Sequence, residues 1–403
     1  MDIVGGVYKE NCLSPDWHGI YGSGGRAALA ICEMGVDVIL HTFLPDDFKI
    51  ILIQESKYCK GNLSVNQYET DERLEFNYTY GLAHVTPPKS NHSDKEIFLK
   101  CKKALIFGMI ECKTLIEAEY AVYDPQSTFK TLSFKESGSS AKHLALVLNE
   151  SEAAVLASKE PLTDPKEIIF TIAENESAEV VVLKRGPAGA IVYHNGIYTT
   201  VPAYMTDIVW KIGSGDCFSA YFAYNWLELK LPPEICAFNA SLATSYYCQT
   251  QCFPSDFHLN EYHPKPVIVN NTARAKVYIA GPIFTLAQLW IIEQLRNNFM
   301  DMGLDVFSPY HDVGLINNKY DIYDNDITGI EEADIIFAII DGLDSGTIFE
   351  IGFATAKGKK VIIYNENVSE KDLVMFSGEN TEIVSDFVTA IYKTIWLSLC
   401  ITK

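Results

Sequence analysis

Short apolar runs bounded by Gly, Pro and Asn recur along the chain and alternate with longer segments of helical period. Such runs predict buried strands, and their alternation with helices predicts a parallel sheet covered by helices. We therefore expect an α/β fold in both halves of the chain. The predicted strands are Val36–Phe43, Ala104–Gly108, Ala145–Leu148, Glu179–Lys184, Lys276–Ala280, Ile335–Ile340 and Lys360–Tyr364, and the clearest predicted helix is Leu286–Met302.

Two regions depart from this alternation. Leu63 to Pro87 is rich in β-branched and aromatic residues of alternating polarity, which predicts a small antiparallel β excursion. Residues 253–275 are polar, carry three prolines and show no sustained period, which predicts a linker. A length of 403 residues exceeds what a single core usually supports, so we expect two domains, at residues 1–252 and 276–403.

Charge and hydropathy narrow the choice of partners. A formal net charge of -20 disfavours a nucleic-acid backbone, whose binding needs clustered Lys and Arg, and favours small-molecule ligands. No apolar run approaches the roughly 20 residues that span a bilayer, and the first residues, MDIVGGVYKENC, lack the regions of a signal peptide. We expect a cytoplasmic protein without a membrane partner.

The cysteines do not indicate a metal site. Ten are scattered along the chain, and the close pair Cys248 and Cys252 has no second pair and no His at zinc-finger spacing. Reduced thiols in a reducing compartment are the expected state.

Carboxylates gather after the predicted strand Ile335–Ile340 of the second domain. Gly281-Pro282 ends its first strand and leaves room for a ligand near the backbone. In open α/β sheets ligands bind at the carboxyl ends of strands, where Asp344 and Glu350 fall. Acidic residues at a helix start are often caps or solvated groups, but Glu350 sits in an apolar helix where a charge is costly without a task. The helix dipole would favour its ionised, nucleophilic form.

The run VYIAGPIF, the segment NDITGIEEAD and the pattern D-S-G-T-x-x-E-x-G-x-A resemble the nucleoside 2-deoxyribosyltransferase family over about Lys276 to Tyr364. The resemblance implies a flavodoxin-like (Rossmann-like) parallel-sheet domain and a two-step exchange through a covalent glycosyl-enzyme, with no cofactor. By the same resemblance Glu350 is the nucleophile and Tyr278 orients it. Asp326 and Asp344 contact the base and the sugar hydroxyls and assist proton transfer, and Gly281, Pro282 and Gly346 line the substrate site.

The same family often completes each site with a residue from a neighbouring subunit, which implies a homo-oligomer. In this chain the corresponding segment, LVMFSGENTE, matches poorly, so that a contribution from Met375 or Asn380 is left open. For Tyr278 a tyrosine packed in the core is the alternative, and Asp341 and Asp321 are expected to be structural or solvated.

The first domain carries weaker signals. GSGGRAALA places Gly24 and Gly25 in a Gly-rich turn before a helix, and GSGD places Gly213 to Asp216 at another helix start. Backbone donors there could form an anion hole for a phosphoryl group, while the aspartate takes a proton from an attacking hydroxyl. A capped helix with a Gly-rich entry is the structural alternative.

Taken in order, these segments resemble the ribokinase-like (PfkB) family of sugar and nucleoside kinases. The resemblance implies an α/β sandwich with a small β lid, and the excursion at 63–87 would supply that lid. The resemblance makes Asp216 the catalytic base and Gly213, Ser214 and Gly215 the anion hole. It assigns Asn149 and Glu152 to the metal and phosphate region, with Mg²⁺ held through Glu152. It places Arg185 and Gly186 near the nucleotide, with ATP as cofactor.

Three departures from the PfkB pattern bear on activity. Glu10 stands where the family has an early sugar-binding aspartate, Arg26 replaces the asparagine of the Gly-rich turn, and Trp210, Lys211 and Ile212 replace an Asp-Thr-Thr run. Because guanidinium pairs with phosphate, we expect Arg26 to bind an anionic substrate. An active kinase and a nucleotide-binding or regulatory domain both remain open.

The leading hypothesis is an enzyme of nucleoside or nucleotide metabolism that cleaves or exchanges an N-glycosidic bond through a glycosyl-Glu350 intermediate, next to a kinase-like domain. The first alternative is an N-glycosidase acting on nucleotides or a nicotinamide dinucleotide, in a defence setting, with the kinase-like domain as sensor. The second is a non-catalytic nucleotide-binding regulatory protein. The base and sugar preference is not encoded in any motif we recognise.

Overall fold

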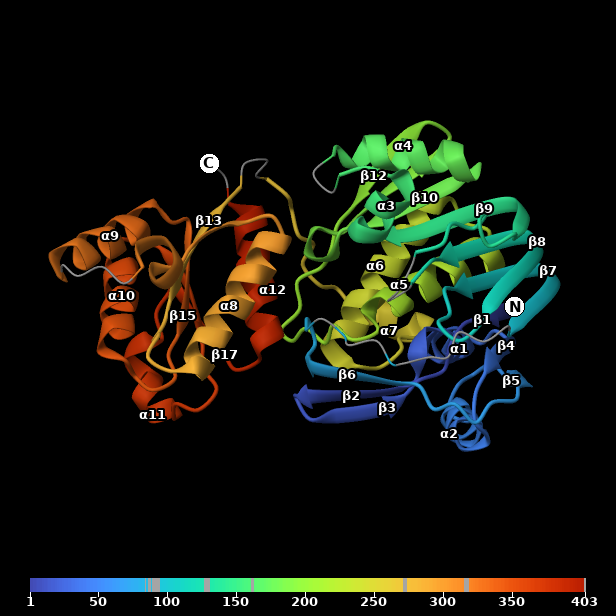
Figure 1. Cartoon of the computed structure of the whole chain (residues 1–403), viewed down its shortest axis with the longest axis horizontal. Coiled ribbons are helices and arrows are strands. Elements are labelled where there is room, and N and C mark those ends of the chain that lie inside the picture. Colours follow the sequence, from blue (N-terminus) through green and yellow to red (C-terminus); the bar gives the residue numbers. More distant parts are fainter. Residues whose placement is uncertain are drawn as a thin grey trace. The chain divides into compact units, whose positions relative to one another are not determined.

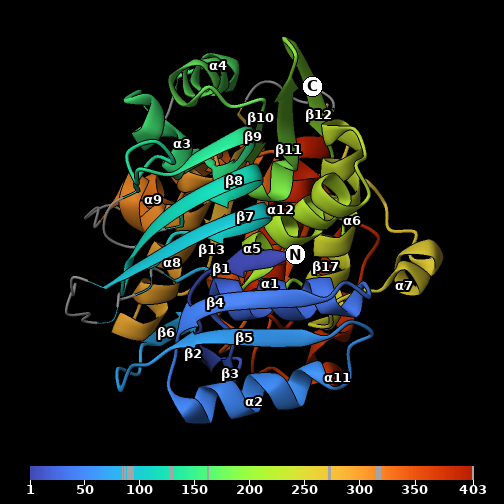
Figure 2. The ribbon, with the colours of Figure 1, turned by 90° about the vertical axis from the view of Figure 1, so that its right-hand side faces the viewer.

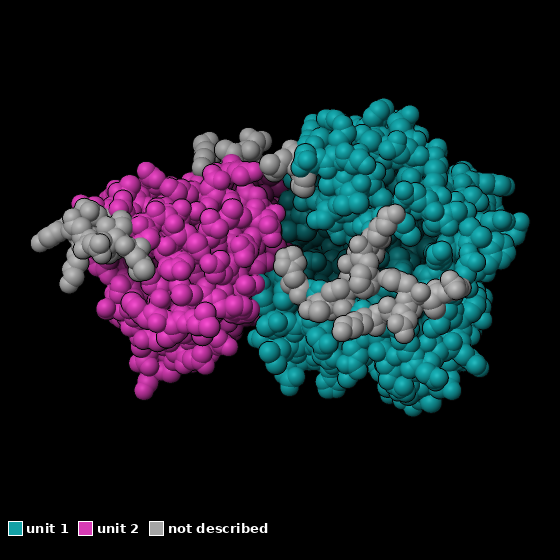
Figure 3. Space-filling model, in the orientation of Figure 1, with its two compact units in different colours: residues 1–206, 210–266 teal, residues 207–209, 267–403 magenta. Residues whose placement is uncertain are grey.

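The chain forms two compact units in the computed structural model. Residues 1–206 and 210–266 make unit 1, and residues 207–209 and 267–403 make unit 2 (Figure 1, Figure 3). The division after residue 266 falls inside the predicted linker, which also contains helix α7 (Asp256–Glu261). The structure describes all residues except 84, 86–87, 89–94, 127–130, 161–162, 271–273, 315–318 and 402–403, and describes only the backbone of 319–322.

A large sheet forms the centre of unit 1. Its strands follow the order β12-β11-β10-β9-β8-β7-β1-β4-β5 and are parallel except at the β10-β11-β12 edge, which is antiparallel (Figure 2). Both faces are buried, which explains why its strands appear in the sequence as continuous apolar runs. The bounds are β1 Asp2–Val4, β4 Val38–Phe43, β5 Leu63–Tyr68, β7 Glu96–Phe107, β8 Lys113–Asp124, β9 Ser140–Asn149, β10 Val180–Lys184, β11 Ala190–His194 and β12 Ile197–Val201.

Helices cover this sheet on both faces, so the unit has two hydrophobic cores. Leu105 and Phe107 of β7 point into the core beneath α1, α5 and α6, whereas Ala104 and Ile106 point into the core beneath α3 and α4. This alternation follows from the two-residue period of a strand. The bounds are α1 Gly22–Glu33, α2 Asp46–Ser56, α3 Glu150–Ala157, α4 Pro165–Glu176, η1 Gly186–Ala188, α5 Ser214–Ala223, η2 Tyr224–Glu228 and α6 Pro233–Thr250.

The small β lid differs from the one predicted. It consists of β2 (Lys9–Ser14), β3 (Trp17–Ile20) and β6 (Glu75–Tyr80), with β6 parallel to β2. The predicted excursion supplies only β6, because β5 (Leu63–Tyr68) pairs with β4 at the edge of the main sheet. The prediction of one antiparallel excursion was wrong because alternating polarity marks a half-buried strand without specifying its partner. His84, Thr86 and Pro87 of the predicted segment lie outside the described residues.

Unit 2 is built on a parallel sheet of order β14-β13-β15-β16-β17, which is the flavodoxin-like order 2-1-3-4-5. Helices α8 and α12 pack together on one face, and α9 and α10 pack together on the other (Figure 1). The bounds are β13 Lys276–Ala280, α8 Leu286–Asp301, β14 Asp305–Phe307, η3 Pro309–Val313, α9 Lys319–Glu332, β15 Ile335–Ile339, α10 Ser345–Ala356, β16 Lys360–Tyr364, α11 Glu370–Leu373, η4 Val374–Phe376, β17 Thr381–Val384 and α12 Phe387–Cys400.

Candidate functional site

The predicted carboxylates of unit 2 lie where its strand order reverses. The chain leaves β13 toward β14 on one side, while β15 pairs with β13 on the other, so the carboxyl ends of β13 and β15 border the switch point at which such sheets bind ligands. Gly281 follows β13, and a Cβ placed there would come within 2.9 Å of the Ile339 side chain. Glycine therefore permits the close packing of these two strand ends, and the adjoining Pro282 is buried.

Tyr278 and Glu350 meet at this switch point. The Tyr278 hydroxyl donates to Glu350 Oε1 at 2.5 Å, across 72 positions of sequence. The Tyr278 side chain is fully buried and its ring stacks on Phe307 with the centroids 5.4 Å apart. Both roles considered for Tyr278 are therefore present: its ring packs in the core, and its hydroxyl holds the carboxylate of the candidate nucleophile.

Burial controls the ionisation of this site. Burial raises the pKa of Glu350 to about 8, while the Tyr278 hydrogen bond lowers it and the charges of Asp326 and Asp344 raise it. Burial also raises the pKa of Asp326 to about 6. We expected the dipole of α10 to favour ionised Glu350, but desolvation outweighs it, so the free carboxyl group is largely protonated at neutral pH.

The two predicted aspartates have different surroundings. Asp326 projects from α9, and its Oδ1 is buried without a hydrogen-bond partner among the described residues. Asp344 is the N-cap of α10, because its Oδ2 accepts from the Thr347 backbone N–H at 2.9 Å and from the Thr347 hydroxyl at 3.1 Å. Asp326 is therefore the aspartate with an oxygen left for a ligand, while one oxygen of Asp344 maintains the helix start.

Other residues of this region support the loops or form their surface. A Cβ at Gly346 would lie 3.0 Å from Asp344 Oδ2. Asp341 accepts from the backbone N–H groups of residues 366 and 367, which agrees with the structural role expected for it. The Asp321 side chain lies outside the described residues. Met375 is 92% exposed, and the backbone carbonyl of Asn380 accepts from residue 361.

Sequence reasoning gave no role to an aromatic pair beside the nucleophile. The ring centroids of Tyr323 and Phe349 lie 6.2 Å apart. Tyr323 is 57% exposed and Phe349 is 50% exposed. Phe349 directly precedes Glu350, and this adjacency in the sequence was the available signal. Exposed rings at this position could stack on a planar base.

In unit 1 the predicted anion hole opens on a cavity of about 240 Å³. Gly213 has a φ of +76° and precedes α5, whose first turn contains Ser214, Gly215 and Asp216. The sequence did not single out most of the other residues around it. The cavity is lined by Tyr8, Glu10, Gly22, Ser23, Phe76, Tyr78, Gly108, Ile110, Gln126, Lys211, Gly213, Gly215 and Asp216.

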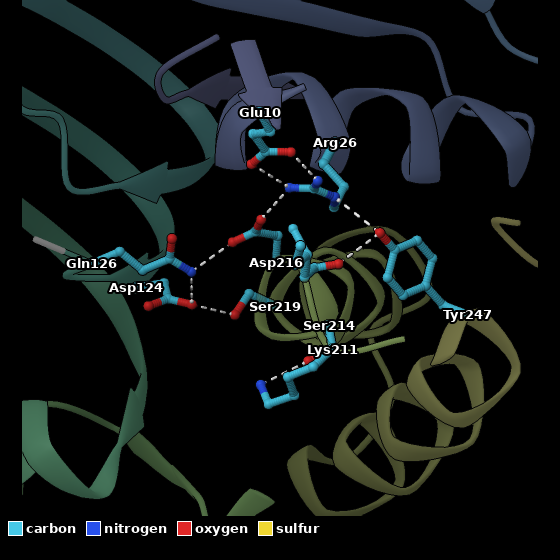
Figure 4. A network of polar contacts seen from close by, with 10 residues as sticks. Glu10, Arg26, Asp124, Gln126, Lys211, Ser214, Asp216, Ser219 and Tyr247 are labelled. Carbon is cyan, nitrogen blue, oxygen red and sulfur yellow. Dashed lines mark hydrogen bonds and ion pairs between the residues drawn. The ribbon is translucent and has the colours of Figure 1, made fainter. Parts of the chain in front are cut away.

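A chain of buried polar contacts crosses this cavity (Figure 4). Arg26 donates to both oxygens of Glu10 and to Asp216 Oδ2, the latter at 2.7 Å. Asp216 Oδ1 accepts from Gln126 at 2.7 Å, and Gln126 also donates to Asp124 at 3.2 Å. Asp124 is the last residue of β8 and Gln126 lies two positions beyond it, so the sequence offered them only as polar residues at a strand end.

The pairing of Arg26 changes the expectation for that residue. Its side chain is 1% exposed, and its guanidinium already serves two carboxylates of the protein. Desolvation opposes its charge, but Glu10, Tyr247 and Asp216 outweigh that effect and raise the pKa of Arg26. Burial, partly offset by Arg26, raises the pKa of Glu10. In this structure Arg26 is paired internally rather than directed at an anionic substrate.

The remaining residues assigned to the kinase-like site have structural contacts. A Cβ at Gly24 would lie 2.5 Å from the Gly5 backbone, so Gly24 lets α1 approach the loop after β1, whereas at Gly25 the nearest atom would be a Val7 methyl at 3.4 Å. Arg185 donates to the Glu150 carboxylate at 3.0 Å, and Gly186 has a φ of +52°.

Asn149 and Glu152 form a reciprocal capping box at the start of α3, with both hydrogen bonds at 2.8 Å. Burial raises the pKa of Glu152 to about 7. This carboxylate is engaged by the backbone, and the described residues contain no group of three His, Cys, Asp or Glu side chains able to hold a metal ion by themselves. A Mg²⁺ ion near Glu152 would therefore take most of its ligands from nucleotide phosphates and water. Across the part of the chain that is described, no helix is long and apolar enough to cross a membrane.

The fold and the sites thus define a protein with a lidded α/β sandwich followed by a flavodoxin-like unit. Two family models match the chain, one in each unit. Residues 113–252 match the pfkB family carbohydrate kinase model, and residues 277–384 match the nucleoside 2-deoxyribosyltransferase model. The chain thus contains one segment similar to pfkB family carbohydrate kinases and one segment similar to nucleoside 2-deoxyribosyltransferases. The first match begins at residue 113, so the Gly-rich turn with Arg26 lies outside it.

Individual relatives are distant. The uncharacterized protein UU063 of Ureaplasma parvum serovar 3 is 36% identical over 101 residues, which cover 22% of this chain and 64% of that protein. Arabidopsis thaliana ribokinase complexed with ribose and ATP is 15% identical and covers 64% of this chain and 97% of its own, with a TM-score of 0.49. Vibrio cholerae fructokinase is 12% identical, and the match covers 65% of this chain and 98% of the fructokinase chain, with a TM-score of 0.48.

Proposed function

We propose that unit 2 breaks the N-glycosidic bond of a nucleoside or nucleotide, with Glu350 as the nucleophile. The observation that carries the proposal is the 2.5 Å hydrogen bond from Tyr278 to Glu350 at the switch point of the sheet. A carboxylate fixed in this way can attack the anomeric carbon as the C–N bond breaks, so that an ester to the sugar replaces the bond to the base. A second base or water then displaces Glu350 from the sugar.

Asp326 fits the role of proton donor to the departing base. Its pKa near 6 leaves part of its population protonated at neutral pH, and its Oδ1 has no partner among the described protein groups. A carboxylic acid with a free oxygen can give its proton to a base nitrogen and later recover it from the incoming base or water. The exposed rings of Tyr323 and Phe349 would stack against the base.

The test is an exchange assay resolved by chromatography. The full-length protein is incubated with a deoxynucleoside and a second free base, and both free bases and both nucleosides are measured. We expect formation of the second nucleoside, reduced by about a thousandfold or more in Glu350→Gln, because a nucleophile has no substitute. Glu379→Gln is the matched control, since it removes the same charge from an exposed site of unit 2.

Two outcomes count against this proposal. One is that neither exchange nor base release occurs for any purine or pyrimidine deoxynucleoside or ribonucleoside tried. The other is that Glu350→Gln remains as active as Glu379→Gln.

Hydrolysis of the intermediate is a second candidate, favoured by the exposure of the segment that the family uses to complete the base site. Met375 is 92% and Val374 is 66% exposed within one chain, and their segment matches the family pattern poorly, which leaves less of the chain to hold an acceptor base. The protein would then be an N-glycosidase on nucleotides or a nicotinamide dinucleotide, with unit 1 as sensor. Base release without exchange supports this candidate, and clean exchange between two bases excludes it.

For unit 1 we propose nucleotide binding at the N-terminal end of α5. Gly213 and Gly215 supply backbone donors there. The Ser214 backbone N–H donates to the Lys211 carbonyl at 3.1 Å, and the Lys211 side chain donates to the Ser214 hydroxyl at 2.9 Å. Calorimetry with ATP measures this binding directly. Tight binding of ATP without turnover of any nucleoside by unit 2 would instead support the non-catalytic regulatory protein.

A further inference from the structure

Arg26 connects the lid of unit 1 to two helices. It projects from α1, donates through both terminal nitrogens to Glu10 on lid strand β2, and donates through Nη1 to Asp216 on α5. Its Nε donates to the Tyr247 hydroxyl of α6 at 3.2 Å. Figure 4 shows the guanidinium between the two carboxylates, with Tyr247 on its other side. One buried side chain thus holds three other elements.

The guanidinium also fills the space over the start of α5. A Cβ at Gly213 would lie 2.0 Å from Arg26 Nε and 2.2 Å from its Cζ. Only a residue without a side chain leaves room for Arg26 at this point, and the φ of +76° at Gly213 favours glycine as well. In this chain the first glycine of the GSGD run is therefore required by Arg26, in addition to any role toward a phosphate.

Both oxygens of Asp216 are engaged by the protein. Oδ2 accepts from Arg26 at 2.7 Å and Oδ1 accepts from Gln126 at 2.7 Å. A general base must lie within hydrogen-bonding distance of the hydroxyl whose proton it takes. A hydroxyl-bearing acceptor lying between Glu10 and Asp216 would have to occupy the volume that the guanidinium already fills.

The pairing is costly to open. Arg26 and the two carboxylates are buried, with side-chain exposures of 1%, 6% and 10%. Withdrawing the guanidinium would leave two carboxylates of like charge side by side in a region of low dielectric, and such broken buried pairs are strongly destabilising. A neutral sugar cannot replace a cation there.

From these contacts we infer that Arg26 is an internal latch: it fixes lid strand β2 to α1 and α5 and occupies the space between Glu10 and Asp216, so that unit 1 does not transfer a phosphoryl group. The inference concerns unit 1 alone and stands or falls independently of Glu350. It is compatible with nucleotide binding at the start of α5, because the latch lies on the acceptor side of Asp216.

The experiment combines thermal unfolding with a phosphoryl-transfer assay on the full chain. Arg26→Met keeps an unbranched stem and removes the charged guanidinium, and we expect it to lower Tm by about 5 to 15 °C. Adding Glu10→Gln to Arg26→Met removes one of the two unpaired carboxylates, so the double variant should recover part of that loss. Lys103→Met breaks a 2.8 Å ion pair with Glu228 outside the cavity and serves as the control, with a shift of about 2 °C or less.

The second measurement is ADP release by the wild type with ATP and Mg²⁺, in the presence of ribose, fructose, myo-inositol or adenosine. We expect no more ADP with any of these acceptors than without one. Acceptor-dependent ADP release by the wild type overturns the inference. So does an Arg26→Met variant whose Tm falls no further than that of Lys103→Met, because the latch would then not exist.

Discussion

At the scale of single residues, Tyr278 and Asp326 act on the Glu350 carboxyl group in opposite directions. The hydroxyl of Tyr278 stabilises the ionised form and lowers the pKa of Glu350, whereas the negative charge of Asp326 raises it. Because only ionised Glu350 can attack, kcat/KM should rise with pH through the pKa near 8 in the wild type when the substrate carries a base that leaves as an anion and so needs no proton from Asp326. The rising limb of the kcat/KM profile would then lie well above the pH at which a glutamate usually ionises.

Substitutions at the two neighbours should therefore move that limb in opposite ways. Tyr278→Phe removes the donor, so we expect the limb to shift to higher pH by about one unit, and Asp326→Asn removes a negative charge, so we expect a shift to lower pH of similar size. The measurement is kcat/KM for base release between pH 5 and about 10. Shifts of the same sign, or none, would show that the limb belongs to another group.

The resemblance of short motifs to a family allowed the Tyr278–Glu350 contact to be predicted across 72 positions. The pairing of Arg26 with Asp216, which are 190 positions apart, could not be predicted in the same way. The sequence showed an arginine where an amide was expected, and an arginine is equally suited to phosphate and to carboxylate. Which of these it meets depends on the fold that brings Glu10 and Asp216 around it.

At the scale of elements, the start of α10 combines a structural and a chemical task in Asp344. Asp344→Ala removes the cap and should cost about 1 kcal/mol of the free energy of unfolding, while Asp344→Ser restores a capping oxygen and should cost little. Both variants lose the carboxylate, so both should lose about tenfold or more in kcat/KM if Asp344 acts on the substrate. Urea unfolding and the exchange assay measure the two effects. A Ser variant with full activity would assign Asp344 to the helix alone.

The predicted Gly-rich turn forms the first turn of α1 itself, and its glycines make a similar distinction possible. Gly24→Ala would bring a methyl group within 2.5 Å of the Gly5 backbone, and we expect a loss of about 1 to 3 kcal/mol from overpacking. Gly25→Ala meets only a Val7 methyl at 3.4 Å, so its effect should stay within about 1 kcal/mol. Denaturant unfolding compares the two. Equal effects would mean that close packing is not what Gly24 provides.

Element positions were largely predictable where strands are buried on both faces. The predicted strands at Lys276–Ala280 and Lys360–Tyr364 coincide with β13 and β16, and the predicted helix from Leu286 ends one residue beyond α8. The lid was less predictable. Its strand β6 pairs with β2, about 65 residues earlier in the chain, and no local pattern records that pairing.

At the scale of the whole molecule, each unit resembles a family of small-molecule enzymes, while the details of the two sites diverge. In unit 2 the candidate nucleophile, its tyrosine and a carboxylic acid with a free oxygen converge at the end of the sheet where ligands bind. In unit 1 the candidate base is held by an arginine and an amide. These contacts support our proposals of glycosidic chemistry in unit 2 and of ligand binding without phosphoryl transfer in unit 1.

The central claim is that Glu350 forms a covalent bond to the sugar. The most direct measurement is mass spectrometry of the protein quenched in acid during turnover of a deoxynucleoside, followed by peptide mapping. The account predicts one added deoxyribosyl group on the peptide that contains Glu350, present in Glu379→Gln and missing in Glu350→Gln. Base release without this adduct, together with undiminished turnover by Glu350→Gln, would contradict it.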